Sequence, residues 1–527
     1  MIDELKGDIK KLKSSHLIII FLLPLLLFLF LRWNSFSMPF ERDEGEYAYS
    51  AWIMSKGISP YTYSFMQKPP MIIYTYLLAR ILSTNALWPA RILMFIFLTL
   101  SVYLLAYLVY KNHGGKEAVL SIYLGFVMLT FPPIYPFAAN TENFLLLFFI
   151  AFYATYTFGK NKRNQGSYWL WGGIFAAISF FYKPIILPMI VLILIIWLVK
   201  YMKLVGEKKG AFINVFLFIL GGLIISFLCL SYFWIKGSMG QLWEYAFLFN
   251  AYYSAQWGLS PRYFLMNMEP FLKYWWFLFI PTLVFVFKDF KSKFEYLGLI
   301  LVGLATVYVS PIAHYYLLLM PFWTLIISIS LVYVWNELVK KRKSEDASGF
   351  VVFTALIIFI MLYPFRMQLG KTPEELNLWE YGSSQPFYEA KIVADHVTRL
   401  SKSDDYIFVA GSEPEVYYYS QRLSPTRFVI VSPLSMKTAK RSDYQKLAIK
   451  ELDTTPPKLI VWVAKEATGL RVYDNATMFT DYLSGLVKKK YILRGGFVMG
   501  YQGYGIWMDN LNSDDIQKAS YLVYEKI

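Results

Sequence analysis

The chain has 527 residues, of which 57% are hydrophobic and 19% aromatic, and its mean hydropathy is +0.42. Soluble domains are about 45–50% apolar, so we expect much of this chain to lie in a membrane. The net charge of +15 would suit nucleic acid, but many basic residues lie in short loops between apolar runs, as in multi-span membrane proteins. Nucleic acid is therefore not an expected partner. Cys229 is the single cysteine, which excludes a disulfide framework and a CxxC site.

Apolar runs long enough to cross about 30 Å of hydrocarbon predict about eleven membrane-spanning helices. The stretch 168–199 is interpreted as two short spans, because Lys183-Pro184 interrupts it and proline lacks a backbone donor. Met71–Ser83 is too short for a span, and we expect an interfacial or re-entrant helix there. The other predicted spans are 16–32, 88–110, 117–136, 140–158, 211–235, 271–288, 294–310, 313–339 and 349–365.

The loops between these runs predict the orientation. Every second loop is net basic, which places it in the cytoplasm by the positive-inside rule. The basic N-terminus precedes an apolar run without a small-residue cleavage site, so we expect an uncleaved first span with a cytoplasmic N-terminus. The predicted location is the plasma membrane, which in a bacterium is the inner membrane. The basic loops are 111–116, 160–164, 200–209, 288–293 and 340–343.

From about Arg366 charged and turn-forming residues become frequent. Short strand-like runs at 407–411, 427–431 and 459–463 alternate with helical patterns such as 387–400. Such alternation predicts a small α/β domain with a mainly parallel sheet. We therefore expect two domains, a membrane domain and an extracytoplasmic soluble domain. Their predicted bounds are 1–365 and 366–527.

The first outer loop, residues 33–70, carries the most concentrated charge pattern. Glu41, Asp43, Glu44 and Glu46 are close together, and because buried charge in hydrocarbon costs several kcal/mol, they must lie in water or line a cavity. Lys68 precedes two prolines, which hold it out of the helical region, and a fixed ammonium suits a phosphate. These residues are a candidate base and phosphate clamp. The alternatives are a solvated acidic surface and a snorkelling lysine.

Three further groups are expected on the same outer face. Glu142 follows Asn140-Thr141, which either caps a helix or delivers a carboxylate to the site. Lys183 is a functional candidate as an intramembrane lysine, unless it snorkels to an interface. His314, Tyr315 and Tyr316 are either aromatic-belt residues or site residues, and a histidine near carboxylates suits a metal.

The common motifs for nucleotide binding and for hydrolases are missing from the sequence. We find no GxGxxG after a strand, no P-loop, no GxSxG and no HExxH. A donor for group transfer is therefore expected to be reached from the lipid.

Taken together, the motifs resemble those of the GT-C glycosyltransferases, in the family-39-like branch with the protein O-mannosyltransferases and the aminoarabinose transferase of lipid A. The outer domain resembles the tail of many bacterial members through Gly411–Glu415 and Tyr417. The matching membrane-domain residues, in the order of the family, are Arg42–Ala48, Gly57, Pro60-Tyr61, Lys68–Pro70, Asn140–Glu142, Lys183-Pro184, Tyr315-Tyr316 and Pro321.

The resemblance implies an inverting transfer of a sugar from a polyprenyl-phosphate donor to a lipid, glycan or protein acceptor on the outer face. The implied catalytic acids are Asp43, Glu44 and Glu142. The implied donor-phosphate residues are Lys68, Tyr47, Lys183, Tyr315 and Tyr316. If a divalent metal ion takes part, its candidate ligands are Asp43, Glu142 and His314. Gln67 stands where the aminoarabinose transferase has a metal-binding glutamate, which leaves metal dependence open.

Two other interpretations stay open at this point. A polytopic transporter or flippase of an anionic lipid-linked substrate would have inverted repeats and acids deep inside its spans, and we find neither. A third interpretation makes the outer domain a binding module on a membrane scaffold.

Overall fold

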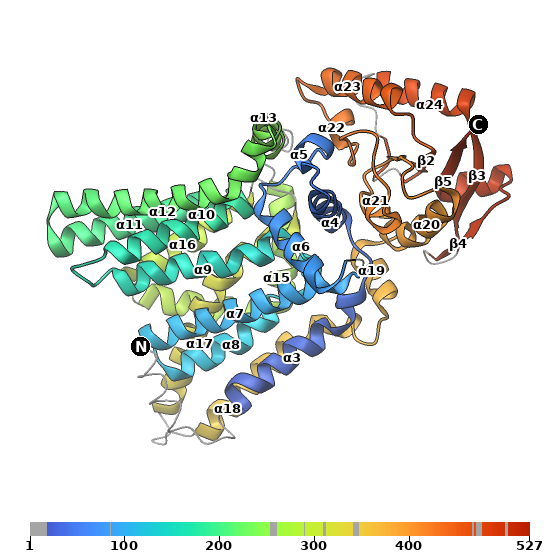
Figure 1. Ribbon diagram of the computed structural model, residues 1–527. Coiled ribbons are helices and arrows are strands. Elements are labelled where there is room, and N and C mark those ends of the chain that lie inside the picture. Colours follow the sequence, from blue (N-terminus) through green and yellow to red (C-terminus); the bar gives the residue numbers. More distant parts are fainter. Residues whose placement is uncertain are drawn as a thin grey trace.

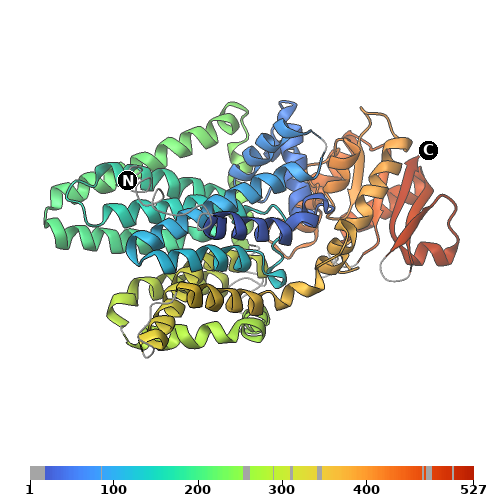
Figure 2. The ribbon, with the colours of Figure 1, turned by 90° about the horizontal axis from the view of Figure 1, so that it is seen from below.

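The computed structural model describes residues 18–84, 86–252, 261–288, 290–308, 312–340, 347–465, 468–470, 477–500 and 504–527. Figure 1 shows a bundle of long helices and a smaller part with helices and a sheet at the C-terminal end of the chain. The segment from α4 to α6 lies between these two parts in both ribbon views (Figures 1 and 2).

Each predicted membrane-spanning run contains a helix. Within the described residues, seven helices are long and apolar enough to cross a membrane. Helices α8, α10, α16 and α18 do not meet this criterion of length and apolarity. The predicted count of about eleven membrane-spanning helices therefore stays a prediction. The helices are α3 (Leu23–Arg32), α7 (Trp88–Asn112), α8 (Gly115–Met128), α9 (Thr141–Gly159), α10 (Gly166–Tyr182), α11 (Leu187–Val205), α12 (Lys208–Ile235), α15 (Pro261–Lys288), α16 (Phe290–Tyr308), α17 (Met320–Lys340) and α18 (Ala347–Met361).

The predicted break at Lys183-Pro184 is confirmed. Helix α10 ends at Tyr182, Lys183 is extended, and the short 3₁₀ turn η4 (Pro184–Ile186) precedes α11. Helix α10 packs tightly on α12, because a Cβ added to Gly173 would come within 1.9 Å of the carbonyl oxygen of Phe218. Small residues allow membrane helices to approach this closely.

The segment between the two parts is largely helical. It contains η2 (Trp33–Ser37), α4 (Arg42–Ser55), α5 (Pro60–Tyr63) and α6 (Met71–Leu82). Helix α4 starts with a capping box, in which Glu41 and Glu44 each accept from the other's backbone N–H. The predicted helix at Met71–Ser83 is present as α6, and its position in the membrane stays a prediction.

Five strands form one sheet in the order β1-β2-β5-β3-β4. The predicted strands at 407–411 and 459–463 are present as β1 and β2, which pair in parallel. The expectation of a mainly parallel sheet is wrong, because the other three pairings are antiparallel. The strands are β1 (Ile407–Ala410), β2 (Leu459–Val463), β3 (Tyr491–Met499), β4 (Gly505–Met508) and β5 (Ala519–Lys526).

The predicted strand at 427–431 is also wrong, since this stretch consists of bends before α22. Its apolar side chains are buried by a different route: the ring of Phe428 stacks on Phe65 of the first outer loop. The Arg427 carbonyl accepts from the Phe65 N–H at 2.6 Å. An apolar run that suits a strand therefore covers the segment that carries the acids.

The helices of the C-terminal part include the predicted helix at 387–400, which is present as α20. The connection from the membrane helices runs through the 3₁₀ turn η7 (Tyr363–Met367). The helices are α19 (Pro373–Tyr381), α20 (Phe387–Leu400), α21 (Glu415–Ser420), α22 (Ser432–Ser435), α23 (Arg441–Thr454), α24 (Met478–Lys490) and α25 (Ser513–Lys518).

Candidate active site

Asp43 and Lys68 converge, as the sequence predicts. The Lys68 Nζ lies 3.7 Å from Asp43 Oδ2, and both side chains are partly exposed, at 15% and 25% respectively. The Tyr47 hydroxyl, one helical turn after Asp43, donates to the same carboxylate oxygen at 3.4 Å. An anion-binding cation and a carboxylate therefore share one partly open place beside α4.

The charges around Asp43 keep it ionised. Burial opposes ionisation, but the positive groups of Lys68, His314 and Lys183 outweigh burial and hold the pKa of Asp43 below its ordinary value. Burial also disfavours the Lys68 ammonium, yet the carboxylate of Asp43 raises the pKa of Lys68 above its ordinary value. The pair is therefore charged at neutral pH.

Backbone contacts hold the chain around Lys68 in place. The Tyr61 hydroxyl donates to the Lys68 carbonyl at 2.6 Å, and the Asn250 side-chain amide donates to the Gln67 carbonyl at 2.5 Å. The Gln67 N–H donates to Glu46 Oε1 at 3.4 Å. Burial raises the pKa of Glu46 to about 8, so this acid is largely protonated at neutral pH. Glu46 thus contributes a contact to the backbone rather than a second negative charge.

Glu142, Lys183, His314 and Tyr315 form a second cluster. Lys183 makes an ion pair with Glu142, and His314 Nε2 lies 3.5 Å from Glu142 Oε1. The Lys183 ammonium also lies 3.5 Å from the ring centroid of Tyr315, a cation–π contact. The break between α10 and α11 places Lys183 here, and the 3₁₀ helix η6 (Ala313–Leu319) contributes the aromatic residues.

The candidate metal ligands do not gather into a metal site. Among the described residues, no three His, Cys, Asp or Glu side chains have the arrangement that would hold an ion. Asp43 pairs with Lys68 and Glu142 with Lys183, so a lysine ammonium stands beside each carboxylate.

Two predicted site residues contact other parts of the molecule. Glu44 is fully buried and forms a bidentate pair with Arg91, with distances of 2.9 Å to Nε and 2.5 Å to Nη2. It also accepts from the Ala139 N–H at 2.8 Å. The Tyr316 hydroxyl donates to the Phe264 carbonyl at 3.3 Å. These contacts hold Glu44 and Tyr316 against other parts of the fold, and their predicted roles stay predictions.

Arg91 is a fully buried residue that none of the sequence motifs contains. In addition to Glu44, its guanidinium donates to the carbonyls of Ser35 at 2.8 Å, Met38, and Pro39 at 3.1 Å. Arg91 therefore fixes the chain that leads into α4. The available signal was an arginine in the first turn of the apolar run 88–110, since charges inside spans are rarely without a role.

The C-terminal part packs directly on α4. A Cβ added to Gly45 would lie 2.6 Å from the backbone nitrogen of Glu415, so only glycine allows this approach of α4 to α21. The Arg42 Nε donates to the Ser412 carbonyl at 2.8 Å, and the Phe40 N–H donates to the Tyr419 hydroxyl at 2.8 Å. We call this contact surface the seam. It fixes the helix that carries Asp43.

The seam contains buried acids. Glu413 and Glu415 are fully buried, and their carboxylate oxygens have no hydrogen-bond partner that meets strict geometry among the described residues. Burial raises the pKa of Glu413 to about 7 and raises that of Glu415 well above its ordinary value. The charged groups that face these two acids are Arg42, Glu41 and Glu389.

We expect the seam to weaken as the pH rises. A carboxyl whose pKa is raised on folding favours the folded state fully below its unfolded value, and this contribution falls as pH rises toward the folded pKa. The unfolding temperature should therefore fall by several degrees between pH 5 and pH 8. The double change Glu413→Gln with Glu415→Gln should flatten this slope, whereas the exposed control Glu374→Gln should keep it. Equal slopes in all three proteins would contradict the assignment.

The described elements correspond to a known fold. The body of apolar helices, together with the small sheet-containing part at the C-terminal end, has the GT-C fold.

Comparisons with known proteins agree with this fold. Residues 67–235 match the family model described as dolichyl-phosphate-mannose-protein mannosyltransferase. No curated protein matches the chain. The family match and the shared fold confirm the resemblance to the GT-C glycosyltransferases.

Two solved structures show how far the fold extends. The crystal structure of ArnT from Cupriavidus metallidurans bound to undecaprenyl phosphate has a TM-score of 0.61 at 12% identity, over 95% of this chain and 99% of that chain. The archaeal oligosaccharyltransferase AglB from Archaeoglobus fulgidus, in complex with an inhibitory peptide and a dolichol-phosphate, has a TM-score of 0.51 at 11% identity. That match covers 94% of this chain and 74% of that chain.

Proposed function

We propose that this protein is an integral membrane glycosyltransferase that moves a sugar from a polyprenyl-phosphate-linked donor to a lipid, glycan or protein acceptor, with inversion. The observation that carries the proposal is the partly exposed pair of Asp43 and Lys68, 3.7 Å apart, in a chain with the GT-C fold. The structures of two structural neighbours contain undecaprenyl phosphate or a dolichol-phosphate, which supports this class of donor.

In the proposed reaction Asp43 is the general base. Its ionised carboxylate takes the proton of an acceptor hydroxyl, whose oxygen attacks the anomeric carbon from the face opposite the phosphate. A new glycosidic bond forms, the bond from carbon to the phosphate oxygen breaks, and the polyprenyl phosphate leaves with the electron pair. A positioned base typically contributes about 10²–10⁴-fold. Tyr47, which donates to Asp43 Oδ2, orients the carboxylate.

Lys68 holds the donor phosphate in this proposal. The ammonium that pairs with Asp43 in the structure would pair with the phosphate when the donor binds, and it would stabilise the charge that develops as the phosphate leaves. Lys183 supplies a second positive charge from the neighbouring cluster, with Glu142 and Tyr315 holding its ammonium in place. In this proposal Glu142 positions Lys183, and His314 lies beside Glu142 in the same cluster.

We further propose that the reaction occurs on the outer face of the plasma membrane, which is the inner membrane in a bacterium. The N-terminus would be cytoplasmic, and residues 366–527 would form the extracytoplasmic domain. The net basic charge of the loops assigned to the cytoplasm supports this orientation. The packing of α21 on α4 supports a position of this domain beside the proposed reaction centre.

Transfer by purified protein tests the proposal. We would reconstitute the full chain in vesicles with synthetic undecaprenyl- and dolichyl-phosphate sugars, add an envelope extract as acceptor source, and measure released polyprenyl phosphate. Products would be identified by mass spectrometry and their anomeric configuration by NMR. The expected result is release of polyprenyl phosphate together with an inverted glycoside.

Replacing Lys68 tests its proposed role in holding the donor phosphate. Lys68→Ala should lower transfer by about 10²–10³-fold, because removing one preorganised group that stabilises developing charge has effects of that size. Lys68→Arg should recover part of the activity, and the exposed control Lys402→Ala should retain all of it. Movement of intact donor across the vesicle membrane without cleavage would favour a flippase instead, and full activity of Lys68→Ala would contradict the assigned role.

A further inference from the structure

Lys68 lies in an irregular stretch whose backbone is held by side chains from other elements. Residues 64–70 connect α5 to α6, and backbone groups outside regular structure depend on such partners. Tyr61 and Glu46 bond to this stretch from the same segment of the chain. Asn250 does so through a contact that joins residues 183 positions apart. The fold, rather than a sequence motif, brings Asn250 to Lys68.

Asn250 fixes the peptide plane that leads into Lys68. Its side-chain amide donates to the Gln67 carbonyl at 2.5 Å and to the Ala246 carbonyl of its own helix at 2.8 Å. Because a carbonyl only accepts, both bonds use the amide nitrogen, which has two hydrogens. The bond to Ala246 fixes the rotation of the side chain. The bond to Gln67 holds a planar peptide group that includes the Lys68 nitrogen, so it fixes the direction in which the lysine side chain starts.

A π turn directs Asn250 toward this stretch. Helix α13 (Met239–Trp243) lies beside α5 in Figure 1 and continues into the π turn η5 (Glu244–Leu248). In a π turn the hydrogen bonds join residues five apart, so these residues lie over one another. The ring of Tyr245 stacks on Phe65 with a centroid distance of 3.9 Å. Asn250, five positions later, reaches the same stretch.

The C-terminal part holds η5 in place. Glu244 accepts from the Lys440 ammonium at 2.9 Å and from the Tyr444 hydroxyl at 2.8 Å. The Arg427 guanidinium donates to the Tyr245 hydroxyl at 3.0 Å. Both polar residues at the start of η5 therefore have partners in the C-terminal part, and the position of Asn250 depends on these contacts.

We propose that Asn250 is a positioning residue for Lys68, and that the C-terminal part keeps Asn250 in place through η5. With the peptide before Lys68 fixed, the ammonium meets the donor phosphate without reorganising, which is the condition for strong stabilisation of developing charge. The inference rests on the proposed role of Lys68, and Asn250 acts through the backbone of that lysine.

Chemical labelling of Lys68 in the full chain tests the positioning without a substrate. The protein in detergent would be treated with acetic anhydride, and the acetylation rate of Lys68 would be read by peptide mass spectrometry. Asn250→Leu removes the donor at similar size and should raise this rate about two- to tenfold, the shift that loss of one hydrogen bond allows. Asn250→Gln keeps a donor and should stay near the parent. A parental rate in Asn250→Leu would overturn the proposal.

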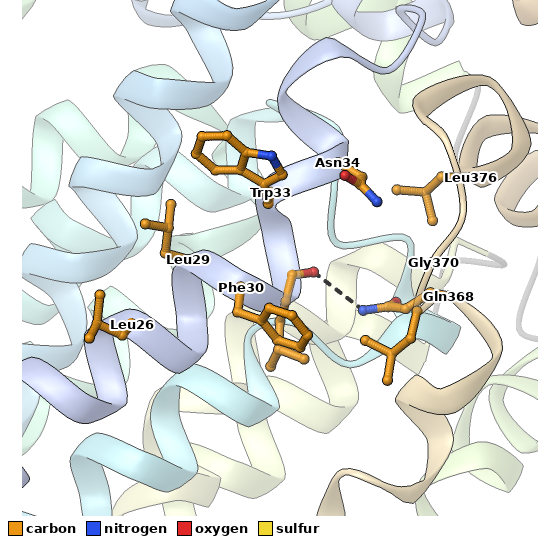
Figure 3. A pocket seen from close by; sticks show the side chains of 10 residues that line it. Leu26, Leu29, Phe30, Trp33, Asn34, Gln368, Gly370 and Leu376 are labelled. Carbon is orange, nitrogen blue, oxygen red and sulfur yellow. Dashed lines mark hydrogen bonds between the residues drawn. The ribbon is translucent and has the colours of Figure 1, made fainter.

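Gln368→Met is the matched control. The Gln368 side-chain amide donates to the Leu31 carbonyl at 3.3 Å, drawn as the dashed line in Figure 3. Like Asn250, it holds a backbone carbonyl far away in the sequence, but it does so between α3 and the chain before α19. This variant loses a bond of the same kind and should leave the labelling of Lys68 unchanged. An equal increase in both variants would indicate a general loosening of the fold and would refute a specific role for Asn250.

The link to the C-terminal part is tested by the double change Glu244→Met with Tyr245→Phe. It removes the polar contacts of η5 with the C-terminal part and keeps a ring to stack on Phe65. Labelling of Lys68 should increase, in the same direction as in Asn250→Leu. A parental rate would exclude the C-terminal part from the positioning of Lys68.

Transfer assays separate positioning from a merely structural loss. Asn250→Leu should lower kcat/KM for the donor by about 10–100-fold, since a small misplacement of a positioned group has effects of that size. In the Lys68→Ala background it should cause no further loss, because no ammonium is left to position. A further loss there would contradict the proposal. If the parent transfers no sugar, the proposed function fails, and the labelling rates still decide whether Asn250 positions Lys68.

Discussion

Replacing Asp43 by asparagine is expected to lower transfer by about 10²–10⁴-fold, the contribution of a positioned general base. Asparagine has nearly the same shape, but it cannot take a proton. The acceptor hydroxyl would then attack without a base, whereas the donor phosphate would still bind to Lys68. We therefore expect the loss in kcat, with donor binding retained. The measurement is the initial rate of polyprenyl phosphate release in reconstituted vesicles.

The control for this variant is Asp404→Asn, which changes an exposed acid of the C-terminal part and should retain activity. The pH profile adds a second measurement. Because the pKa of Asp43 is below its ordinary value, parent activity should not decline on the acid side until the pH falls below about 4, the ordinary value for aspartate. An Asp43→Asn protein with parental kcat would exclude this aspartate as the base.

Replacing Arg91 by methionine is expected to destabilise the protein by about 3–5 kcal/mol. Removing one partner of a buried ion pair leaves the other charge uncompensated, and losses of this size are typical. Glu44 would remain fully buried, and the carbonyls of Ser35 and Pro39 would lose their donor. The measurement is the unfolding temperature of the full chain in detergent, together with its transfer rate.

A double-mutant cycle distinguishes the ion pair from the other contacts of Arg91. The change Glu44→Leu in the Arg91→Met background removes the stranded charge and should recover part of the lost stability. The exposed control Arg399→Met should melt as the parent does. If Arg91→Met lowered stability no more than Arg399→Met, the proposed anchoring of the chain into α4 would be refuted.

The seam bears on the interpretation of the outer domain as a separate binding module. Gly45 of α4 approaches the backbone of α21 more closely than a side chain would allow, and the Tyr49 hydroxyl accepts from the Ser424 N–H at 3.1 Å. Contacts of this kind give the domain a part in positioning α4. They favour a structural contribution to the reaction centre over a module that acts independently.

Much of the architecture follows from local chemistry. Long apolar runs require a membrane, and every predicted run contains a helix. The Lys183-Pro184 break follows from the missing N–H of proline. Strands β1 and β2 and helix α20 follow from their apolar patterns. The proximity of Asp43 and Lys68 was expected from the charges of one outer segment and from the resemblance to GT-C enzymes, and the structure places the two groups 3.7 Å apart.

Two features of the C-terminal part depended on contacts distant in the sequence. The sheet is mostly antiparallel because β5 inserts between β2 and β3, and an apolar pattern does not specify the direction of its neighbour. Residues 427–431 have the pattern of a strand, but Phe428 is buried against Phe65 instead. An apolar pattern indicates that side chains are buried, but it does not indicate which segment covers them.

The sequence by itself determined that this is a membrane protein with an acidic segment after the first apolar run, a proline-braced lysine and a distinct C-terminal part. Only the tertiary structure distinguished the surroundings of the neighbouring acids Asp43 and Glu44. A helix turns about 100° per residue at 3.6 residues per turn, so adjacent carboxylates point in different directions. Asp43 lies beside Lys68 at a partly open place, and Glu44 is buried against Arg91. The partner across the fold sets the surroundings of each carboxylate.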